Sequence, residues 1–145
     1  MTSLQPPYSA VKPDVEKEVL PYCEKNDVGV IVYSPMQSGL LSGRMTKERV
    51  ASFPQNDWRS KSNDFKEPRL SRNLALAELM ANIGKRRGKS AAVVAIAWTL
   101  RLNSVTAAIV GARDASQVDG FIDAAQFRLS AEEVAEIDRF LVEHP

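Results

Sequence analysis

The sequence has very little of the two residue types that most often bind transition metals. Among its 145 residues there is one cysteine, Cys23, and one histidine, His144. A single cysteine excludes a disulfide within the chain and a zinc site built from several cysteines, and it is typical of a reducing compartment. A metal site would therefore need clustered carboxylates, and none has the spacing of metal ligands. We expect no metal site.

The sequence also lacks an excess of charge of one sign and a long hydrophobic run. Nineteen lysine and arginine residues and eighteen aspartate and glutamate residues leave a formal net charge of +1. Such a chain creates no overall field that would attract nucleic acid or an anionic membrane. No apolar run approaches the roughly 18 residues of a membrane-spanning helix, and the first residues show no signal peptide. These features predict a cytoplasmic protein.

The composition and the order of elements predict one α/β domain. A content of 44% hydrophobic and 26% charged residues is typical of a folded domain. The segments 27–34 and 105–110 are rich in β-branched and apolar residues on both faces, which is typical of parallel strands covered by helices. Helical patterns alternate with these strands, which indicates parallel pairing with crossover connections.

One helix is predicted before the first strand, and a second helix is predicted after the long loop that follows this strand. An acidic start and an apolar face predict a helix over 14–26, with which Pro21 conflicts unless it lies in the first turn or kinks the helix. A second helix ends in the basic run "GKRRGK", 84–89, and its apolar positions are Leu76, Leu79, Met80 and Ile83. The basic run is interpreted as a solvated helix end rather than as a binding patch.

Three further helices carry capping signals. Ser90 is expected to cap a very apolar helix in which Trp98 is a core residue. Asp114 is expected to cap the next helix, and Ser130 with Glu133 forms a capping box for the last one. The apolar stripe of the Asp114 helix is expected at Val118, Phe121, Ile122 and Ala125, and that of the last helix at Val134, Ile137 and Leu141.

A long polar segment separates the first strand from the second helix. Residues 52–71 are polar and punctuated by prolines, and loops of this length in a compact domain are usually functional or disordered. We expect residues 45–72 to form a long loop over the end of the sheet at which the strands terminate.

Both strands run directly into polar loops that contain glycine. "YSPMQSGLLSGR" follows the first strand and "GARDASQ" follows the second. Hydroxyl groups, freed backbone amides and the guanidinium groups of Arg44 and Arg113 are the groups that bind phosphate oxygens. Because the ends of parallel strands meet at one edge, the two loops suit a ligand with more than one phosphate. Tyr33 at the first strand's end is open to two interpretations, a packing residue or a ring that stacks on a planar ligand.

At these residues the sequence resembles the aldo-keto reductase family. The resemblance covers nearly the whole chain, in family order and at family spacing. It is carried by the segments "LQPPYS", "EVLPYCEKNDVGVIVYSPMQSGLLSGR", "NDWRS", "KSAAVVAIAWTLRLNSVTAAIVGAR" and "RLSAEEVAEID".

The resemblance implies a (β/α)8 TIM barrel that binds an extended NADP(H) across the strand ends and transfers hydride to a small carbonyl substrate. Gln5 matches the glutamine that holds the nicotinamide carboxamide, and Tyr33 matches the aromatic residue that stacks on the nicotinamide. The residues that match the loop around the pyrophosphate are Ser34, Pro35, Met36, Ser38, Leu40 and Arg44. Those that match the 2'-phosphate segment are Gly111, Arg113 and Gln117, of which Arg113 is expected to favour NADPH over NADH.

The sequence departs from the family pattern in the adenine site and in catalysis. Many relatives place a glutamate and an asparagine at the adenine, where this chain has Gly120 and Phe121. Arg59 belongs to a loop that folds over the cofactor or substrate in similar proteins, and here it is either such a contact or a solvated arginine. The family's catalytic tyrosine, lysine, aspartate and histidine come from the first half of the barrel, and Tyr8 and Tyr22 do not match the tyrosine motif. No catalytic residue is assigned.

The resemblance covers only the part of the barrel from about the end of the sixth strand. Two strands and a fragment cannot close a barrel, so we expect open strand edges and exposed apolar helix faces, especially around Trp98. Self-association or pairing with a complementary N-terminal half would cover them. The alternative function is a non-catalytic nucleotide-binding or interaction module, similar to channel-associated subunits of this family. The substrate is not predicted.

Overall fold

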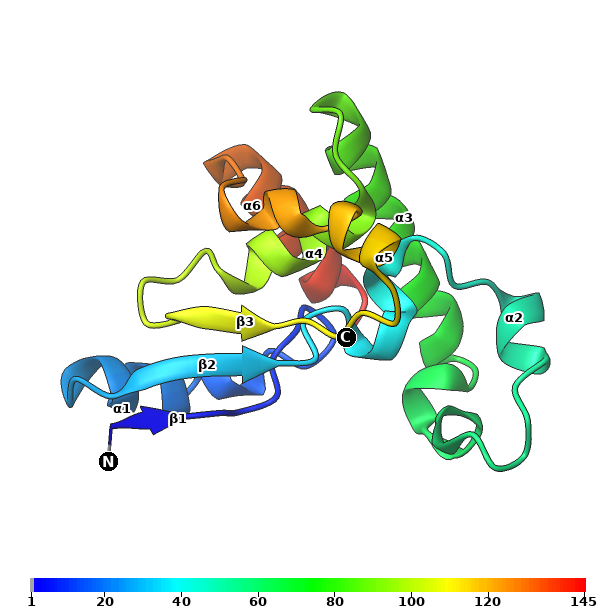
Figure 1. The fold of residues 1–145 in the computed structure, drawn as a ribbon, viewed down its shortest axis with the longest axis horizontal. Helices are drawn as coiled ribbons and strands as arrows, with labels where there is room; N and C mark the ends of the chain where they lie inside the picture. The colour runs from blue at the N-terminus through cyan, green and yellow to red at the C-terminus, as the bar shows by residue number, and fades with distance from the viewer. Residues whose placement is uncertain (1) are drawn as a thin grey trace.

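Three short parallel strands form the sheet of this fold. The structure is a computed structural model that describes residues 2–145. The strands are β1 (Ser3–Leu4), β2 (Gly29–Tyr33) and β3 (Ala107–Ile109), with β2 between the other two (Figure 1). Tyr33 and Ile109 are register partners at the ends of their strands. The parallel order confirms the α/β prediction, although β2 and β3 are shorter than the expected segments.

Helices and short 3-10 turns make up most of the remaining chain. The α-helices are α1 (Val19–Lys25), α2 (Lys47–Ala51), α3 (Arg69–Arg86), α4 (Ala91–Thr99), α5 (Ala115–Asp119) and α6 (Ala131–Glu143). The 3-10 turns are η1 (Asp14–Glu16), η2 (Gln37–Ser42), η3 (Trp58–Lys61), η4 (Asn63–Phe65) and η5 (Ile122–Ala125). A membrane-spanning helix is not found within residues 2–145, because α4 is apolar but short and the longer α3 is too polar.

The prediction of a single helix over 14–26 is wrong. The segment divides into η1 and α1, which begins at Val19. Pro21 is then the third residue of α1 and lies in its first turn, where a backbone N–H would have no partner within the helix. The proline therefore defines where the helix can begin.

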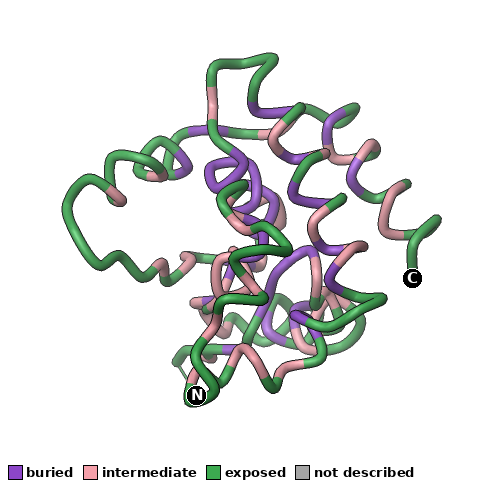
Figure 2. The backbone as a smooth tube through the Cα atoms, turned by 90° about the vertical axis from the view of Figure 1, so that its right-hand side faces the viewer, coloured by how far each residue is buried: buried purple, intermediate pink, exposed green. Residues whose placement is uncertain are grey.

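The core is built around α4, whose nine residues are all buried. Ser90 caps this helix, because its hydroxyl accepts a hydrogen bond from the Val93 amide at 3.2 Å. Helix α3 packs along α4 and also contacts α6. The buried positions run through the middle of the molecule in Figure 2. The Ser90 cap is thereby confirmed.

The core position of Trp98 is confirmed, but the expected exposed apolar surface around it is not found among residues 2–145. The Trp98 side chain is 1% exposed. The Tyr8 ring lies 5.3 Å from it, and the Arg101 guanidinium carbon lies 3.7 Å from the ring centroid. The segment after β1 and the end of α4 therefore cover the tryptophan within this chain.

The Asp114 cap is confirmed, but of the apolar stripe predicted after it only Phe121 packs against the core. The Asp114 carboxylate accepts a hydrogen bond from the Gln117 amide at 3.1 Å. Helix α5 ends after five residues at Asp119 instead of continuing, and η5 follows. Ile122 is consequently 56% exposed, and Ala124 is buried in place of Ala125.

The last helix and the basic run agree with their predictions. The Ser130 hydroxyl accepts from the Glu133 amide at 3.2 Å, and the Glu133 carboxylate accepts from the Ser130 amide at 2.8 Å, which confirms the capping box. Three of the four cations of the basic run form ion pairs at 2.6–2.9 Å, which are Arg86 with Glu136, Arg87 with Glu133 and Lys89 with Asp123. The run is a paired helix end and not a free cationic patch.

The segment 45–72 contains more structure than the predicted loop. It includes α2, η3, η4 and the first residues of α3, and it lies beyond the arrowheads of the strands in Figure 1. Its apolar side chains form a small cluster together with Leu40 of the loop after β2, and Leu40, Phe65 and Leu70 are the buried members of this cluster. The segment therefore packs against the first strand-end loop through a second core.

Candidate functional site

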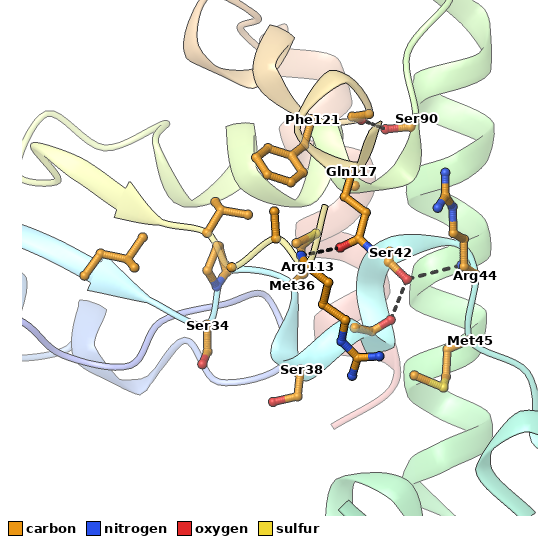
Figure 3. Close-up of a pocket in the computed structure, with 18 of the residues that line it drawn as sticks. Ser34, Met36, Ser38, Ser42, Arg44, Met45, Ser90, Arg113, Gln117 and Phe121 are labelled. Carbon is orange, nitrogen blue, oxygen red and sulfur yellow. Dashed lines mark hydrogen bonds between the residues drawn. The ribbon is translucent and has the colours of Figure 1, made fainter. Parts of the chain in front are cut away.

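Two loops meet where β2 and β3 end. We call residues 34–44 the first loop and residues 110–117 the second loop. Because Tyr33 and Ile109 are register partners, the chain leaves both strands at neighbouring positions. The loops enclose a cavity of about 650 Å³, to which the sequence segments after both strands contribute side chains (Figure 3). The prediction that the two loops are adjacent is confirmed.

Unusual backbone conformations shape the first loop. Ser34, Gln37 and Ser38 have positive φ angles of 59°, 45° and 55°, a region that non-glycine residues rarely occupy. Gly39 and Gly43 follow with φ angles of 95° and 74°. Backbone hydrogen bonds within the loop hold these turns, because the Gln37 amide donates to the Ser34 carbonyl at 2.9 Å and the Gly39 and Leu41 amides donate to the Met36 carbonyl at 3.1 Å. The loop thus has a fixed and strained shape.

Buried leucines and a close approach to α4 hold the first loop in place. Leu40 and Leu41 are fully buried beneath it. A Cβ atom on Gly43 would lie 3.0 Å from the Ala91 Cβ atom, so glycine permits the loop to pack on the start of α4. The Ser42 hydroxyl donates to the Gly39 carbonyl at 2.7 Å. The first loop is therefore held by packing as well as by hydrogen bonds.

Hydrogen bonds among its own residues shape the second loop. The Asp114 carboxylate accepts from the Ser116 hydroxyl at 2.6 Å and from the Gln117 amide at 3.1 Å. Both hydrogen bonds lower the pKa of Asp114 below its usual value, and the bond from Ser116 has the larger effect. The Gln117 side-chain oxygen accepts from the Arg113 amide at 3.1 Å. The carboxylate is thus turned to the backbone of its own helix, as its capping role predicts.

The structure brings most of the predicted site residues to this cavity. The lining includes Tyr33, Ser34, Pro35, Met36, Ser38, Arg44, Gly111, Arg113 and Gln117. Gln5 and Leu40 do not line it. Gln5 is exposed and precedes Pro6, whose carbonyl accepts a hydrogen bond from the Tyr33 amide at 3.1 Å, so it lies near the end of β2. Leu40 faces the small apolar cluster instead.

Tyr33 has the exposure that a stacking residue requires. It is 42% exposed, and its register partner Ile109 is 46% exposed. Both residues line the cavity, and neither belongs to a core cluster. The packing interpretation is therefore disfavoured, and stacking on a ligand stays a prediction.

Sequence reasoning missed several residues of the lining. They are Met45, Arg49, Ser90, Ala92, Ile109, Val110 and Ala112. Ser90 and Ala92 come from the start of α4, and the Ser90 hydroxyl also donates to the Gly120 carbonyl at 3.0 Å. Arg49 comes from α2, within the segment predicted as loop, and no local pattern places it here.

The cavity is rich in guanidinium groups. Arg44, Arg49, Arg59 and Arg113 line it. Within residues 2–145, only Arg59 of these four has a carboxylate within 4.0 Å. Arg44, Arg49 and Arg113 therefore form no salt bridge in the chain as described, although Arg44 lies close enough to Asp114, and Arg113 to Asp57, for their charges to interact. Positive charge without a direct salt bridge is typical of an anion-binding site.

Arg59 is not a solvated loop arginine. Its guanidinium lies 2.6 Å from the Asp57 carboxylate, and its side chain is 19% exposed. Its central carbon also lies 4.1 Å from the centroid of the Phe53 ring. The hydrogen bonds from Arg59 lower the pKa of Asp57 to about 2. Because Asp57 already neutralises its charge, Arg59 forms part of the cavity wall but adds little free positive charge to it.

Among the residues that the structure describes, no three histidine, cysteine, aspartate or glutamate side chains converge as metal ligands.

Comparison with known proteins identifies the family. The sequence model of the aldo/keto reductase family matches residues 1–142. The chain belongs to this family. It is 30% identical over 140 residues to the aldo-keto reductase YhdN of Bacillus subtilis strain 168, and 27% identical over 137 residues to the probable aldo-keto reductase 1 of Glycine max. These matches cover 96% and 94% of this chain.

A solved aldo-keto reductase structure shows the same fold. The glycerol dehydrogenase AKR11B4 of Gluconobacter oxydans matches with a TM-score of 0.89 and 34% identity over 98% of this chain. The chain spans 42% of that structure, 42% of the B. subtilis relative and 39% of the G. max relative. The three-stranded parallel sheet therefore fits part of a TIM barrel, which confirms the resemblance and the coarse fold.

Proposed function

We propose that this chain is a cofactor-binding part of an NADP(H)-dependent aldo-keto reductase that reduces aldehydes or ketones to alcohols. The observation that carries the proposal is the meeting of the two loops on one cavity with three unpaired guanidinium groups. Family membership supports the nicotinamide cofactor, and the charge distribution supports a ligand with several phosphates. NADP(H) differs from NAD(H) by one further phosphate, for which the second loop has Arg113.

Each part of the cavity offers groups that fit one part of this cofactor. The exposed ring of Tyr33 would support the nicotinamide, and the amides and hydroxyl groups of the first loop with Arg44 would bind the pyrophosphate. Arg113 and Gln117 would bind the 2'-phosphate, because Gly111 leaves open space beside them. NADPH supplies the hydride of the reduction when it is bound. The residues of this chain bind and orient it.

The adenine is expected to be held mainly by apolar contact. Gly120 and Phe121 line the cavity, and they stand where the family resemblance would place a glutamate and an asparagine. The Gly120 carbonyl already accepts from Ser90, and the Phe121 ring is half-buried. Contact with a flat aromatic ring is a suitable substitute for the missing hydrogen bonds.

We assign no catalytic residue to this chain and propose that it binds the cofactor without reducing carbonyls by itself. Reduction would then require the remaining part of a barrel, as a complementary N-terminal half or through association of copies. The structure supports such an association, because β1 and β3 each have one strand neighbour among the described residues.

A fluorescence titration with NADPH tests the proposal. We expect saturable binding by the wild-type chain and an affinity at least about tenfold weaker for Arg113→Ala, because a charged hydrogen bond to phosphate is lost. Arg139→Ala is the matched control, since Arg139 is an exposed residue of α6 outside the cavity. Absence of wild-type binding, or an equal loss in the control, would contradict the proposal.

A further inference from the structure

A buried carboxylate outside the cavity is connected to the first loop. Asp64 belongs to η4 in the segment 45–72, and it is 5% exposed. It does not line the cavity, and neither the cofactor contacts nor the second loop involve it. A buried carboxylate is costly unless it is well bonded, so its partners indicate its role.

A chain of hydrogen bonds joins Asp64 to the middle of the first loop. The Gln37 side-chain amide donates to the Asp64 carboxylate at 2.8 Å. The Gln37 side-chain oxygen accepts from the hydroxyl of Ser9 at 3.1 Å, and Ser9 is fully buried. Both ends of the Gln37 amide are therefore bonded, one to the segment after β1 and one to η4.

Other groups fix the position of Asp64 itself. The Lys12 ammonium lies 3.1 Å from one carboxylate oxygen, and the Arg69 guanidinium lies 3.7 Å from the other. The Asn73 side-chain amide donates to the Asp64 carbonyl at 3.0 Å. Asp64 is thus held by α3 and by the segment after β1 at the same time.

The bonded residue is one of those with a strained backbone. Gln37 has a φ angle of 45°, and Ser38 beside it has 55°. A non-glycine residue keeps this conformation only where its surroundings over-determine it. Met36 and Ser38, the two neighbours of Gln37, both line the cavity. The bonds of Gln37 therefore act directly on the backbone that presents groups to the ligand.

We propose that Asp64 and Gln37 are positioning residues that hold the first loop in its ligand-binding conformation before the cofactor arrives. The inference rests on the proposed NADP(H) function of the same cavity. Neither side chain touches the cofactor in this account. They increase affinity because the loop does not have to be ordered at the moment of binding.

The test compares two ligands and three variants of the purified chain. Gln37→Met keeps the length of the side chain but removes both hydrogen bonds, and Asp64→Ala removes the carboxylate. Arg69→Met is the matched control, because it removes a charge near Asp64 without removing a partner of Gln37. The ligands are NADPH, which would contact both loops, and adenosine 2'-monophosphate, which would depend on the second loop.

We expect Gln37→Met and Asp64→Ala to weaken NADPH binding about tenfold, while Arg69→Met stays within about twofold of wild type. All variants should bind adenosine 2'-monophosphate with nearly wild-type affinity. The double variant Gln37→Met with Asp64→Ala should lose little more than either single one, because the two residues act through one bond. Faster amide exchange confined to residues 36–43 would accompany the loss.

Several outcomes would overturn the inference. Wild-type NADPH affinity in Gln37→Met would show that the bonds do not prepare the loop. An equal loss for both ligands would show a general structural role. If the wild-type chain itself failed to bind NADPH, the proposed function would be wrong. If only the positioning role were wrong, the wild-type chain would still bind NADPH saturably.

Discussion

The two loops of the cavity differ in how they are held. The first loop has strained φ angles, buried leucines beneath it and long-range hydrogen bonds to Ser9 and Asp64. The second loop is exposed, and its described hydrogen bonds join residues within five positions of one another. The first loop therefore supplies a prepared shape, and the second supplies a charged group on a short local turn. The comparison teaches that one ligand site can combine rigid packing with locally bonded charge.

The largest expected difference between the loops concerns a glycine in each. Gly43→Ala should lower the free energy of unfolding by about 2 kcal/mol, because alanine is strained at positive φ, and the new Cβ would lie 3.0 Å from Ala91. Gly111→Ala should change it by less than about 0.5 kcal/mol, since no atom lies within 4 Å of its added Cβ. Urea unfolding of both variants measures this, and equal losses would remove the distinction between a packed and an open loop.

The next effect concerns the choice between the two nicotinamide cofactors. Arg113→Ala should weaken NADPH binding about tenfold and NADH binding less than about threefold, because NADH has no 2'-phosphate. Arg44→Ala should weaken both cofactors by a similar factor, because the pyrophosphate is common to them. Paired fluorescence titrations measure the four affinities. A uniform loss from Arg113→Ala would contradict its assignment to the 2'-phosphate.

The smallest effect is a pH dependence of the segment beside the first loop. The folded pKa of Asp57 is about 2, below its ordinary value, because Arg59 donates hydrogen bonds to the carboxylate. The stabilisation is therefore present above about pH 4 and is lost as the pH falls toward 2. Trp58 lies between these two residues and is 61% exposed, so its fluorescence reports the change. Asp57→Asn should abolish this transition, and a transition of wild-type size in that variant would assign it to another group.

Local signals in the sequence predicted helix starts well. Ser90, Asp114 and the Ser130–Glu133 box all cap the helices they were expected to cap, because capping depends on a few neighbouring residues. The extent of α5 was not predictable in the same way. Its apolar periodicity continues past Gly120, but the chain turns there.

Long-range relations were less accessible to the sequence. The convergence of the two strand ends followed from the rules of parallel sheets, so most of the cavity residues were found. The core position of Trp98 was predicted, but the Tyr8 and Arg101 side chains that cover it were not, because Tyr8 lies 93 positions before Arg101. The bond between Gln37 and Asp64 was missed for the same physical reason. A glutamine and an aspartate in polar segments carry no local sign of burial.

The most direct test of whether the two loops form one cofactor site is amide chemical-shift mapping of the wild-type chain with NADPH. If the two loops form one site, NADPH shifts the amides of residues 34–44 and 110–117 along one binding curve, whereas adenosine 2'-monophosphate shifts mainly those of the second loop. Shifts confined to one loop, or two loops that follow different binding curves with NADPH, would contradict the single site.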